Sequence, residues 1–308
     1  MANQRWLAIL AFRLVTGHVS LVTIQMKTVE LPDGKRVPAL GQGTWRMGEN
    51  KNAHADEVAA LRLGIDLGMT LIDTAEMYGE GGSEKVVADA IVGQRDRVFV
   101  VTKVYPQNAS RTELPRACER SLKRLRIDAV DLYLLHWRGD VPLAETVEAF
   151  EKLRSVGKIR RWGVSNFDVG DMKELLAIEN GSACAANQVL YNLENREIEF
   201  DLLPFLHEQS TLNYRPALMA YSPVGHGRGL LNNSTLNEIA KRKDATAAQV
   251  ALAWVLRQPD GIAIPKASDQ DHVRQNAQSL EIELTKEDLA EIDRGFPPPK
   301  SKEPLPTL

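Results

Sequence analysis

The sequence has little cysteine and no strong excess of charge of either sign. Cys118 and Cys184 are the two cysteines among 308 residues, and they lie too far apart to form a CxxC motif. This excludes a disulfide-rich secreted scaffold and a cysteine zinc site, and it favours a reducing, cytoplasmic location. The formal net charge of -3 gives no broad positive field, so we expect no nucleic-acid partner and at most a small anionic ligand.

Motifs of two common enzyme classes are also missing. The six histidines form neither an HExxH motif nor a His/Cys cluster, so we expect no metal and exclude a zinc hydrolase. No GxGxxG turn follows an early strand, because the glycines of residues 79–83 follow a loop and have a different spacing. The chain therefore lacks the usual signature of a Rossmann dinucleotide-binding domain.

The first 25 residues differ from the rest of the chain. Arginines flank an apolar run at residues 6–12, which is too short to cross a membrane and is not followed by the small residues of a signal cleavage site. We expect residues 1–25 to be an N-terminal extension outside the core, upstream of a natural start near Met26, with a transit-type segment as the alternative. Residues 26–308 then form a single domain without a membrane partner.

Short β-branched runs alternate with helical patterns from Leu40 onward, which is typical of parallel βα units. Most successive runs are separated by roughly the 30 residues that a strand, a crossover helix and a return need. Eight runs have this character: 39–43, 70–73, 98–103, 130–136, 159–165, 186–189, 217–221 and 261–265. Eight such units predict a closed (β/α)8 barrel, with a doubly wound open sheet as the alternative.

Two of the intervening helices have recognisable ends. Ser110-Arg-Thr-Glu113 reads as a capping box, and apolar residues follow it at helical spacing: Leu114, Ala117, Cys118, Leu122 and Leu125. An earlier helical stripe consists of Val58, Leu61 and Ile65 and ends at Gly68, which can adopt the left-handed conformation. Each helix is therefore expected to pack one face on a sheet.

Ionisable residues close three of the apolar runs: Asp73, Lys103 and His136. Each alone has an ordinary structural interpretation, as a helix cap, an exposed lysine or a buried histidine. In a barrel, however, the carboxyl ends of successive strands meet at one rim, where a concave site and perturbed pKa values are expected. Tyr78 follows Asp73 by five residues, within reach of the same rim.

These four residues could act as a proton donor, Tyr78, and the groups that assist it. The pKa of a free tyrosine is about 10, too high for efficient proton transfer near neutral pH. A neighbouring Lys103 ammonium would lower that pKa, and Asp73 would hold the lysine in place. His136 would donate a hydrogen bond to a substrate oxygen without titrating.

A second set of strand-end residues is polar but uncharged: Ser165, Asn166, Gln188, Tyr221 and Ser222. Their amide and hydroxyl groups suit a neutral carboxamide, and Tyr221 could stack on a heterocycle, although an aromatic at a strand end is also ordinary packing. After the last run, Lys266 and Ser268 precede a helix that starts near Asp269. They could bind a phosphate through charge and helix-terminal amides, and a solvated lysine is the alternative.

Together these segments resemble the aldo-keto reductases, in particular small-loop bacterial or fungal aldehyde and ketoaldehyde reductases. The resemblance extends from about residue 29 to residue 293. It rests on seven ordered segments: 71–79, 101–103, 134–137, 163–167, 187–188, 220–223 and 264–266. It implies a (β/α)8 barrel that binds a nicotinamide cofactor in an extended conformation and reduces carbonyl groups.

The resemblance also implies roles for individual residues. The implied catalytic tetrad is Asp73, Tyr78, Lys103 and His136. The implied cofactor contacts are Gly43, Thr44, Asp73, Ser165, Asn166, Gln188, Tyr221, Ser222, Pro223, Val224, Gly225, Ile264, Lys266, Ala267, Ser268, His272 and Asn276. The implied substrate contacts are Trp45, Tyr78, His136 and Trp137.

One implied cofactor contact departs from the family pattern. His272 stands where many members place an arginine against the 2′-phosphate of the cofactor, and it is a weaker, pH-dependent cation. We expect NADPH because Lys266 is kept, with NADH also possible. The segment between Tyr221 and Lys266 and the tail after Asp293 are short, and residues 301–308 are proline-rich, so we expect an open pocket. We also expect a monomer that reduces small aldehydes, methylglyoxal-type ketoaldehydes or sugars.

Two other functions fit the same barrel. One is a cofactor-binding regulatory or scaffolding subunit with little turnover, like the potassium-channel β subunits, and the intact tetrad argues against it. The other is a structural barrel without a cofactor. Cofactor titration and a turnover assay distinguish all three.

Overall fold

Eight parallel strands form a closed barrel in the computed structural model of the chain, which describes residues 7–15, 18–210, 214, 216–225 and 229–308. The strands are β5 (Gln42–Gly43), β6 (Leu71–Asp73), β7 (Phe99–Val104), β8 (Leu132–Leu135), β9 (Trp162–Ser165), β10 (Ala186–Leu190), β11 (Ala217–Tyr221) and β12 (Gly261–Ile264). They are hydrogen-bonded in sequence order. Parallel bridges from Leu40 to Ala263 and from Gly43 to Lys266 join the first strand to the last. The predicted (β/α)8 barrel is therefore confirmed, and the open sheet is excluded.

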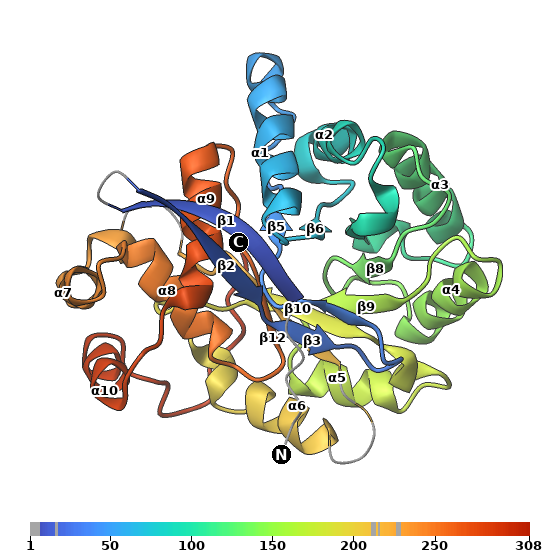
Figure 1. Cartoon of the computed structure of the whole chain (residues 1–308). Helices are drawn as coiled ribbons and strands as arrows, with labels where there is room; N and C mark the ends of the chain where they lie inside the picture. The colour runs from blue at the N-terminus through green and yellow to red at the C-terminus, as the bar shows by residue number, and fades with distance from the viewer. Residues whose placement is uncertain (1–6, 16–17, 211–213, 215, 226–228) are drawn as a thin grey trace.

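Helices connect the strands and surround the barrel (Figure 1). They are α1 (His54–Asp66), α2 (Gly82–Ala90), α3 (Glu113–Leu125), α4 (Leu143–Ser155), α5 (Val169–Leu176), α6 (Leu202–Ser210), α7 (Ser234–Arg242), α8 (Ala247–Leu256), α9 (Gln270–Gln278) and α10 (Lys286–Gly295). Two helices, α7 and α8, lie between β11 and β12, which explains why the last two strands are farther apart in sequence than the others.

Most of the helix features that the sequence predicts are present in the structure. The predicted apolar faces of α1 and α3 pack on the core, and Gly68 has a φ of 89° after α1, as expected of a left-handed helix end. The capping box is formed only in part. Ser110 Oγ accepts a hydrogen bond from the Glu113 amide at 3.2 Å, but the Glu113 carboxylate binds Arg116 instead. The continuous helix accordingly begins at Glu113.

The strand starts differ from the predictions at three strands. β5 begins at Gln42 rather than at Ala39. β8 and β9 begin at Leu132 and Trp162 rather than at Val130 and Ile159. Val130 and Ile159 nevertheless pair with each other through an isolated parallel bridge. The two runs therefore meet where the sequence places them, with an interruption of the ladder between the bridge and the regular strands.

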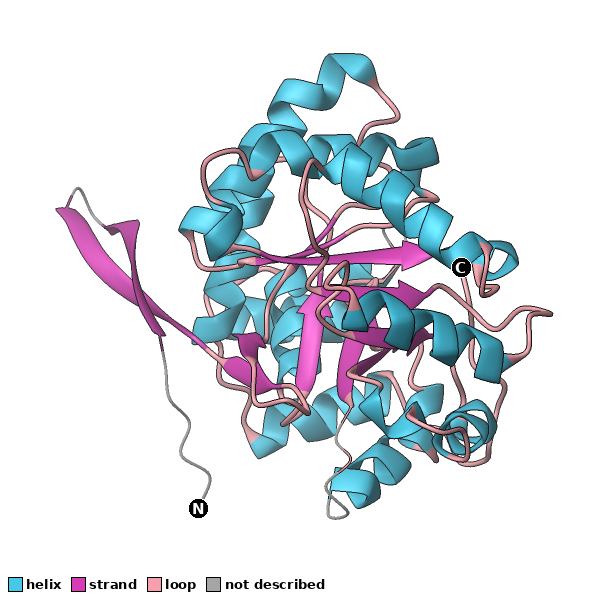
Figure 2. Cartoon of the chain, turned by 90° about the vertical axis from the view of Figure 1, so that its right-hand side faces the viewer, coloured by secondary structure: helices cyan, strands magenta, loops and turns pink. Residues whose placement is uncertain are grey.

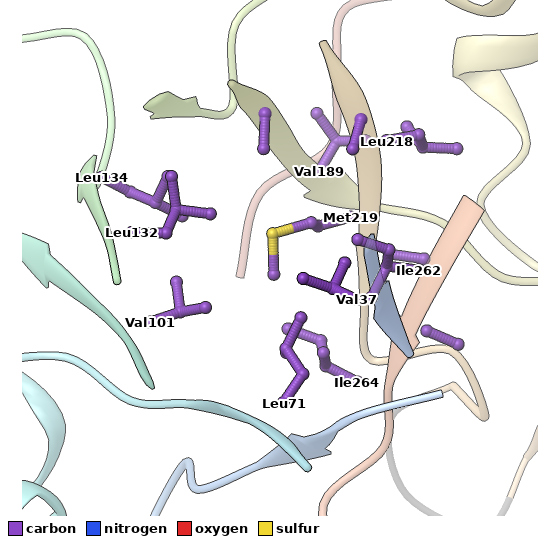
Figure 3. Close-up of a cluster of buried hydrophobic side chains, with 14 of the residues drawn as sticks. Val37, Leu71, Val101, Leu132, Leu134, Val189, Leu218, Met219, Ile262 and Ile264 are labelled. Carbon is purple, nitrogen blue, oxygen red and sulfur yellow. The ribbon is translucent and has the colours of Figure 1, made fainter. Parts of the chain in front are cut away.

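Apolar side chains from the strands fill the barrel interior (Figure 3). A hairpin of β3 (Thr28–Glu30) and β4 (Arg36–Pro38) adds Val37 to this cluster. At the seam between the first and last strands the backbones approach closely, and a Cβ on Gly43 would lie 2.7 Å from the Ile264 carbonyl oxygen. A glycine is therefore required at this strand end, which also lines the functional site.

An antiparallel hairpin precedes the barrel. Its strands are β1 (Leu7–Val15) and β2 (His18–Met26), which form a sheet of their own. The hairpin and the C-terminus lie on opposite sides of the barrel (Figure 2). Residues 1–6 and 16–17 of the predicted extension lie outside the described residues, and the boundary near residue 26 stays a prediction.

Candidate active site

A cavity of ≈ 610 Å³ lies at the carboxyl ends of the barrel strands. Its floor and walls come from the last residues of the strands and from the loops that follow them. The predicted residues that line it are Gly43, Thr44, Trp45, Asp73, Tyr78, His136, Trp137, Ser165, Asn166, Gln188, Tyr221, Ser222, Pro223, Val224, Gly225, Ile264 and Lys266. The barrel thus brings together residues from Gly43 to Lys266, which are far apart in sequence.

Asp73 and Lys103 form a buried ion pair at the floor of this cavity. Lys103 Nζ donates to Asp73 Oδ2 at 2.7 Å, and the two side chains are 0% and 3% exposed, respectively. Burial alone would lower the pKa of the Lys103 ammonium, but Asp73 and Tyr78 together hold it above its ordinary value. Lys103 is therefore charged at neutral pH. It does not belong to the cavity lining but lies beneath it.

Tyr78 lies directly above this pair, in the loop that follows β6. Lys103 Nζ is 3.3 Å from the Tyr78 hydroxyl and 4.9 Å from the centre of its ring. The surrounding protein raises the pKa of the phenol above its ordinary value, while the Lys103 ammonium acts in the opposite direction. Lys103 therefore lowers this pKa, as expected, but desolvation outweighs the ammonium, so the net pKa in the free protein is raised. Tyr78 is fully protonated near pH 7.

His136 follows β8 and faces the same point. Its ring is edge-on to the Tyr78 ring, with centroids 5.8 Å apart. Burial and the nearby Lys103 charge lower the pKa of the imidazole to about 2, so the ring is neutral, as predicted. Nδ1 is buried and has no hydrogen-bond partner among the described residues. The tautomer with its proton on Nε2 can therefore donate into the cavity.

The neutral polar residues form a network on the opposite wall. Gln188 Nε2 donates to Asp73 Oδ1 at 2.8 Å, and Ser165 Oγ donates to the Gln188 carbonyl at 2.8 Å. The Asn166 side chain connects His136 to Tyr221, because Nδ2 donates to the His136 carbonyl and Oδ1 accepts from the Tyr221 hydroxyl. Asn166 has a φ of 60°, a left-handed conformation that asparagine tolerates. This network fixes the Tyr221 ring relative to His136.

A tight turn follows β11 and continues the cavity wall. The Gly225 amide donates to the Ser222 carbonyl at 3.0 Å, and Ser222 itself has a φ of 47°. The buried Asn192 also donates to the Ser222 carbonyl at 3.0 Å. Sequence reasoning missed Asn192, because a lone asparagine in a loop carries no signal of this role. Residues 226–228 lie outside the described part of the chain.

The predicted phosphate-binding segment lies beyond the cavity lining. Lys266 lines the rim, and its Nζ donates to Ser268 Oγ at 3.1 Å. The remaining predicted residues of this segment lie outside the lining: Ala267, Ser268, His272 and Asn276. The Asp269 carboxylate accepts from the amides of Asp271 and His272 at the start of α9. Two of the helix-terminal amides expected to bind a phosphate are therefore occupied by a carboxylate.

Aromatic side chains form the remaining wall. Trp137 packs against His136 with centroids 4.9 Å apart and is edge-on to Tyr105 at 6.0 Å. Trp45 lines the cavity from the loop after β5, beneath the Arg46 guanidinium at 4.3 Å. The two predicted substrate-pocket tryptophans thus both face the cavity in which Tyr78 and His136 lie.

This arrangement agrees with comparisons against known proteins. Residues 39–295 match the Aldo/keto reductase family. The chain belongs to this family. It is 52% identical to methylglyoxal reductase YeaE of Escherichia coli strain K12 over 286 residues, which covers 92% of this chain and 99% of the relative. It is 35% identical to glyoxal reductase of Bacillus subtilis strain 168, covering 86% of this chain and 91% of that protein.

A solved structure shares the same fold and much of the sequence. The aldo-keto reductase from Klebsiella pneumoniae in complex with NADPH superposes on this chain with a TM-score of 0.88 at 52% identity. The match covers 92% of this chain and 99% of that one. The barrel and its strand-end cavity are therefore those of an aldo-keto reductase.

Four lining residues of the cavity were not predicted from the sequence: Met77, Arg138, Thr307 and Leu308. Met77 and Arg138 adjoin Tyr78 and Trp137 in sequence, so their adjacency was the one available signal. Thr307 and Leu308 lie far from any strand end and carried none.

The tail that contains these last two residues runs to the cavity mouth. Lys302 Nζ lies 3.1 Å from an Asp201 carboxylate oxygen and 3.8 Å from one of Asp168, which fixes the tail against the barrel. Leu308 lies close to the Tyr221 hydroxyl. Thr307 and Leu308 therefore form part of the cavity lining, which the expectation of an open pocket did not include.

Two other features bear on partners. Within the described ranges, no helix combines the length and apolarity that a membrane crossing needs. In the same ranges, no group of three or more His, Cys, Asp or Glu side chains is arranged to hold a metal ion.

Proposed function

We propose that this aldo-keto reductase reduces small aldehydes and ketones to alcohols with NADPH, and that Tyr78 is the proton donor. The observation that carries the proposal is the position of Lys103 Nζ, which binds both Asp73 and the Tyr78 hydroxyl at the floor of the cavity. The names of its relatives support the substrate class, since they include a methylglyoxal reductase and a glyoxal reductase.

The cavity suits a nicotinamide cofactor in size and in the chemistry of its walls. Ser165, Asn166 and Gln188 offer hydrogen bonds to a carboxamide, and Tyr221 offers an aromatic face. The turn from Ser222 to Gly225 and the Lys266 ammonium lie where a pyrophosphate and a ribose phosphate would be held. When bound, NADPH supplies the hydride that reduces the carbonyl carbon. The NADPH complex of the Klebsiella pneumoniae relative supports this choice of cofactor.

The protein's own residues orient the substrate and transfer the proton. The neutral His136 orients the carbonyl by donating a hydrogen bond from Nε2 to its oxygen. Tyr78 transfers its hydroxyl proton to that oxygen as the alcohol forms. The Lys103 ammonium stabilises the resulting phenolate, and Asp73 keeps Lys103 charged and in position. Because the free phenol has a raised pKa, the proton is available at neutral pH and leaves only when negative charge develops on the substrate oxygen.

Several further assignments belong to this proposal. We infer a cytoplasmic monomer, in which residues 26–308 form the catalytic domain and residues 1–25 an extension. His272, Ala267, Ser268 and Asn276 would contact the adenosine end of the cofactor, beyond the cavity lining. Trp45 and Trp137 would contact the substrate.

The test compares Tyr78→Phe with wild type in NADPH binding and in turnover of methylglyoxal. Tyr78→Phe keeps the ring and removes the proton, so NADPH should still quench tryptophan fluorescence while kcat falls by about 100-fold or more. Tyr105→Phe is the matched control, because it removes a phenol near Trp137 that does not contact Lys103. Full activity in Tyr78→Phe would refute the role of Tyr78. NADPH binding without turnover in wild type would favour the regulatory barrel instead.

A further inference from the structure

The loop of residues 74–81, which carries Tyr78, has an unusual backbone. After Tyr78, the residues Gly79, Glu80 and Gly81 have positive φ values of 55°, 52° and 83°, respectively. A positive φ is unfavourable for Glu80, which has a side chain, and it persists only where the surrounding structure holds the backbone in place. The position of the Tyr78 hydroxyl therefore depends on the contacts that fix the two ends of this loop.

The far end of the loop is fixed by two buried side chains at the start of α2. Ser83 Oγ lies 2.8 Å from the Thr44 carbonyl oxygen and 2.7 Å from that of Met47. Glu84 Oε1 accepts a hydrogen bond from Thr102 Oγ1 at 2.7 Å, which ties α2 to β7. The near end follows β6 directly and is irregular, so its anchors must come from the loop itself.

Glu76 is the anchor at the near end. Its side chain is 6% exposed although it carries a carboxylate. Oε1 accepts two hydrogen bonds, from the Tyr105 amide at 2.8 Å and from Asn108 Nδ2 at 3.0 Å. The Glu76 amide donates to the Lys103 carbonyl at 3.3 Å. Glu76 therefore binds β7 and the loop that follows it through both its main chain and its side chain.

The carboxylate takes the place of a main-chain acceptor where the two loops separate. The ladder between β6 and β7 continues beyond β6 as far as the Glu76 amide, which donates to the Lys103 carbonyl. Two residues further along the chain from Lys103, the Tyr105 amide meets the Glu76 carboxylate instead of a carbonyl. A hydrogen bond to a carboxylate is stronger than one to a neutral acceptor. The side chain thus extends the ladder and holds the first part of the Tyr78 loop against β7.

This anchor lies close in sequence to both members of the proton-donating pair. Tyr78 comes two positions after Glu76, and Tyr105 comes two positions after Lys103. The Tyr78 hydroxyl lies 3.3 Å from Lys103 Nζ, so a small displacement of the loop would lengthen this contact beyond hydrogen-bonding distance. A misplacement of about 1 Å can cost about 100-fold in rate. Glu76 itself lies outside the cavity lining, so it acts through Tyr78 and not on the substrate.

We propose that Glu76 is a positioning residue, whose two side-chain hydrogen bonds hold the Tyr78 hydroxyl beside Lys103. This inference rests on the proposed reduction with Tyr78 as proton donor and adds a residue to it. The residues proposed to hold the nicotinamide lie on the opposite wall of the cavity. Glu76 should therefore control the rate of the chemical step and leave the binding of NADPH unchanged.

The test measures the rate of NADPH oxidation in a single turnover, after the protein–NADPH complex is mixed with saturating methylglyoxal. Product release does not enter this rate. In Glu76→Ala the rate should fall about tenfold or more, while the NADPH dissociation constant stays within about threefold of wild type. Glu76→Gln should recover most of the rate, because its amide oxygen can accept both hydrogen bonds. An equally low rate in Glu76→Gln would overturn the proposal.

Asp131 offers a matched control at the opposite end of β7. Its side chain is 13% exposed, and Oδ2 accepts from the Val100 amide at 2.9 Å and from Arg95 Nη2 at 2.6 Å. These contacts lie at the amino ends of the strands, away from the cavity. Asp131→Ala removes a similar carboxylate–amide bond to β7, so it should lower Tm and leave the single-turnover rate unchanged.

The remaining outcomes separate positioning from stability. A merely structural role would lower Tm in both Glu76→Ala and Asp131→Ala and leave the single-turnover rate of each unaltered, which would overturn the proposal. If Glu76→Ala fails to fold, Glu76→Asp decides, because its side chain keeps the charge but is one methylene shorter. Its rate should lie below that of Glu76→Gln, and a rate equal to wild type overturns the proposal. If wild type does not oxidise NADPH with methylglyoxal, the proposed reduction itself fails.

Discussion

The Asp73–Lys103 pair allows the chemistry and the stability of the site to be tested together. Lys103→Met removes the ammonium and leaves the Asp73 carboxylate, 3% exposed, with Gln188 as its remaining partner. Breaking a buried ion pair by removing one partner costs about 3–5 kcal/mol, because the other charge stays buried without compensation. Asp73→Asn has the same consequence in the opposite sense, since Lys103 then keeps only the Thr74 carbonyl and the Tyr78 hydroxyl.

The double variant Asp73→Asn/Lys103→Met should be more stable than either single variant. It removes both charges, so no buried ion is left unpaired, and its loss of stability should be about 2 kcal/mol or less. Additive single effects would instead give a loss of roughly 6–10 kcal/mol. The sign of the coupling therefore separates a true ion pair from two independent buried groups.

Thermal unfolding gives the assay. Unfolding entropy is about 2.1 cal/mol/K per residue, so for this chain it is roughly 0.65 kcal/mol/K, and a loss of about 4 kcal/mol lowers Tm by about 6 °C. Melting is followed by circular dichroism without cofactor, because a bound ligand would add its own stabilisation. Single variants that melt within about 1 °C of wild type, or a double variant that shows the additive loss, would refute the reasoning.

The pH dependence of Lys103→Met gives a further check with a definite sign. Burial already raises the pKa of the Asp73 carboxyl in the intact protein, although Lys103 opposes this shift. Removal of Lys103 should raise that pKa further above the unfolded value of about 3.9. Its contribution to stability is then fully present below that unfolded pKa and is lost as the pH rises through the folded pKa. The deficit of Lys103→Met relative to wild type should therefore shrink on acidification. A deficit that is constant from neutral pH down to pH 4 would contradict this.

Three other predictions test the remaining assignments. His272→Arg should raise the ratio of kcat/KM for NADPH to that for NADH, because a guanidinium is permanently charged, and an unchanged ratio would place the 2′-phosphate elsewhere. Since the pKa of His136 is lowered to about 2, the wild type should lose stability relative to His136→Gln as the pH falls below about 6.5, by up to roughly 1.4 kcal/mol per pH unit. Equal acid sensitivity of the two in urea titrations would show that His136 is not buried neutral. A chain that begins at Met26 should fold and reduce methylglyoxal as the full chain does, because β1 and β2 pair with each other and not with the barrel; loss of activity would show that the hairpin belongs to the domain.

The barrel could be predicted from sequence because each βα unit is a local pattern. The β-branched runs, the stripe of α1 and the stop at Gly68 are all set within about 30 residues of chain. The exact strand starts could not be predicted as well, because they depend on how each strand pairs with the adjacent strand. Val130 and Ile159 pair across strands in an isolated bridge, and no property of either run alone shows that the regular ladder begins later.

The convergence of the site residues was predictable for a topological reason. The carboxyl ends of all strands in a closed parallel barrel share one rim, so Asp73 and Lys103 must lie near each other once the fold is known. The pKa of Tyr78 was not predictable in the same way. Its direction depends on a balance between desolvation and the Lys103 charge, and burial of a loop residue cannot be obtained from local sequence.

The features that were missed depend on contacts between distant segments. The tail lines the cavity, and its Lys302 pairs with Asp201, which lies far earlier in the chain. Arg138 was missed for a different reason, since an arginine after a strand is ordinarily solvated, and only its anchored Nη2 and unpartnered Nη1 set it apart.

The charges at the reacting end of the cavity are balanced. At the reacting end, Asp73 and Lys103 cancel and His136 is neutral, so a carbonyl meets polar groups but no net charge. The other permanently charged side chains among the described lining residues are Arg138, which is paired with Glu174, and Lys266. Any change at Lys103 should alter the reaction of every substrate.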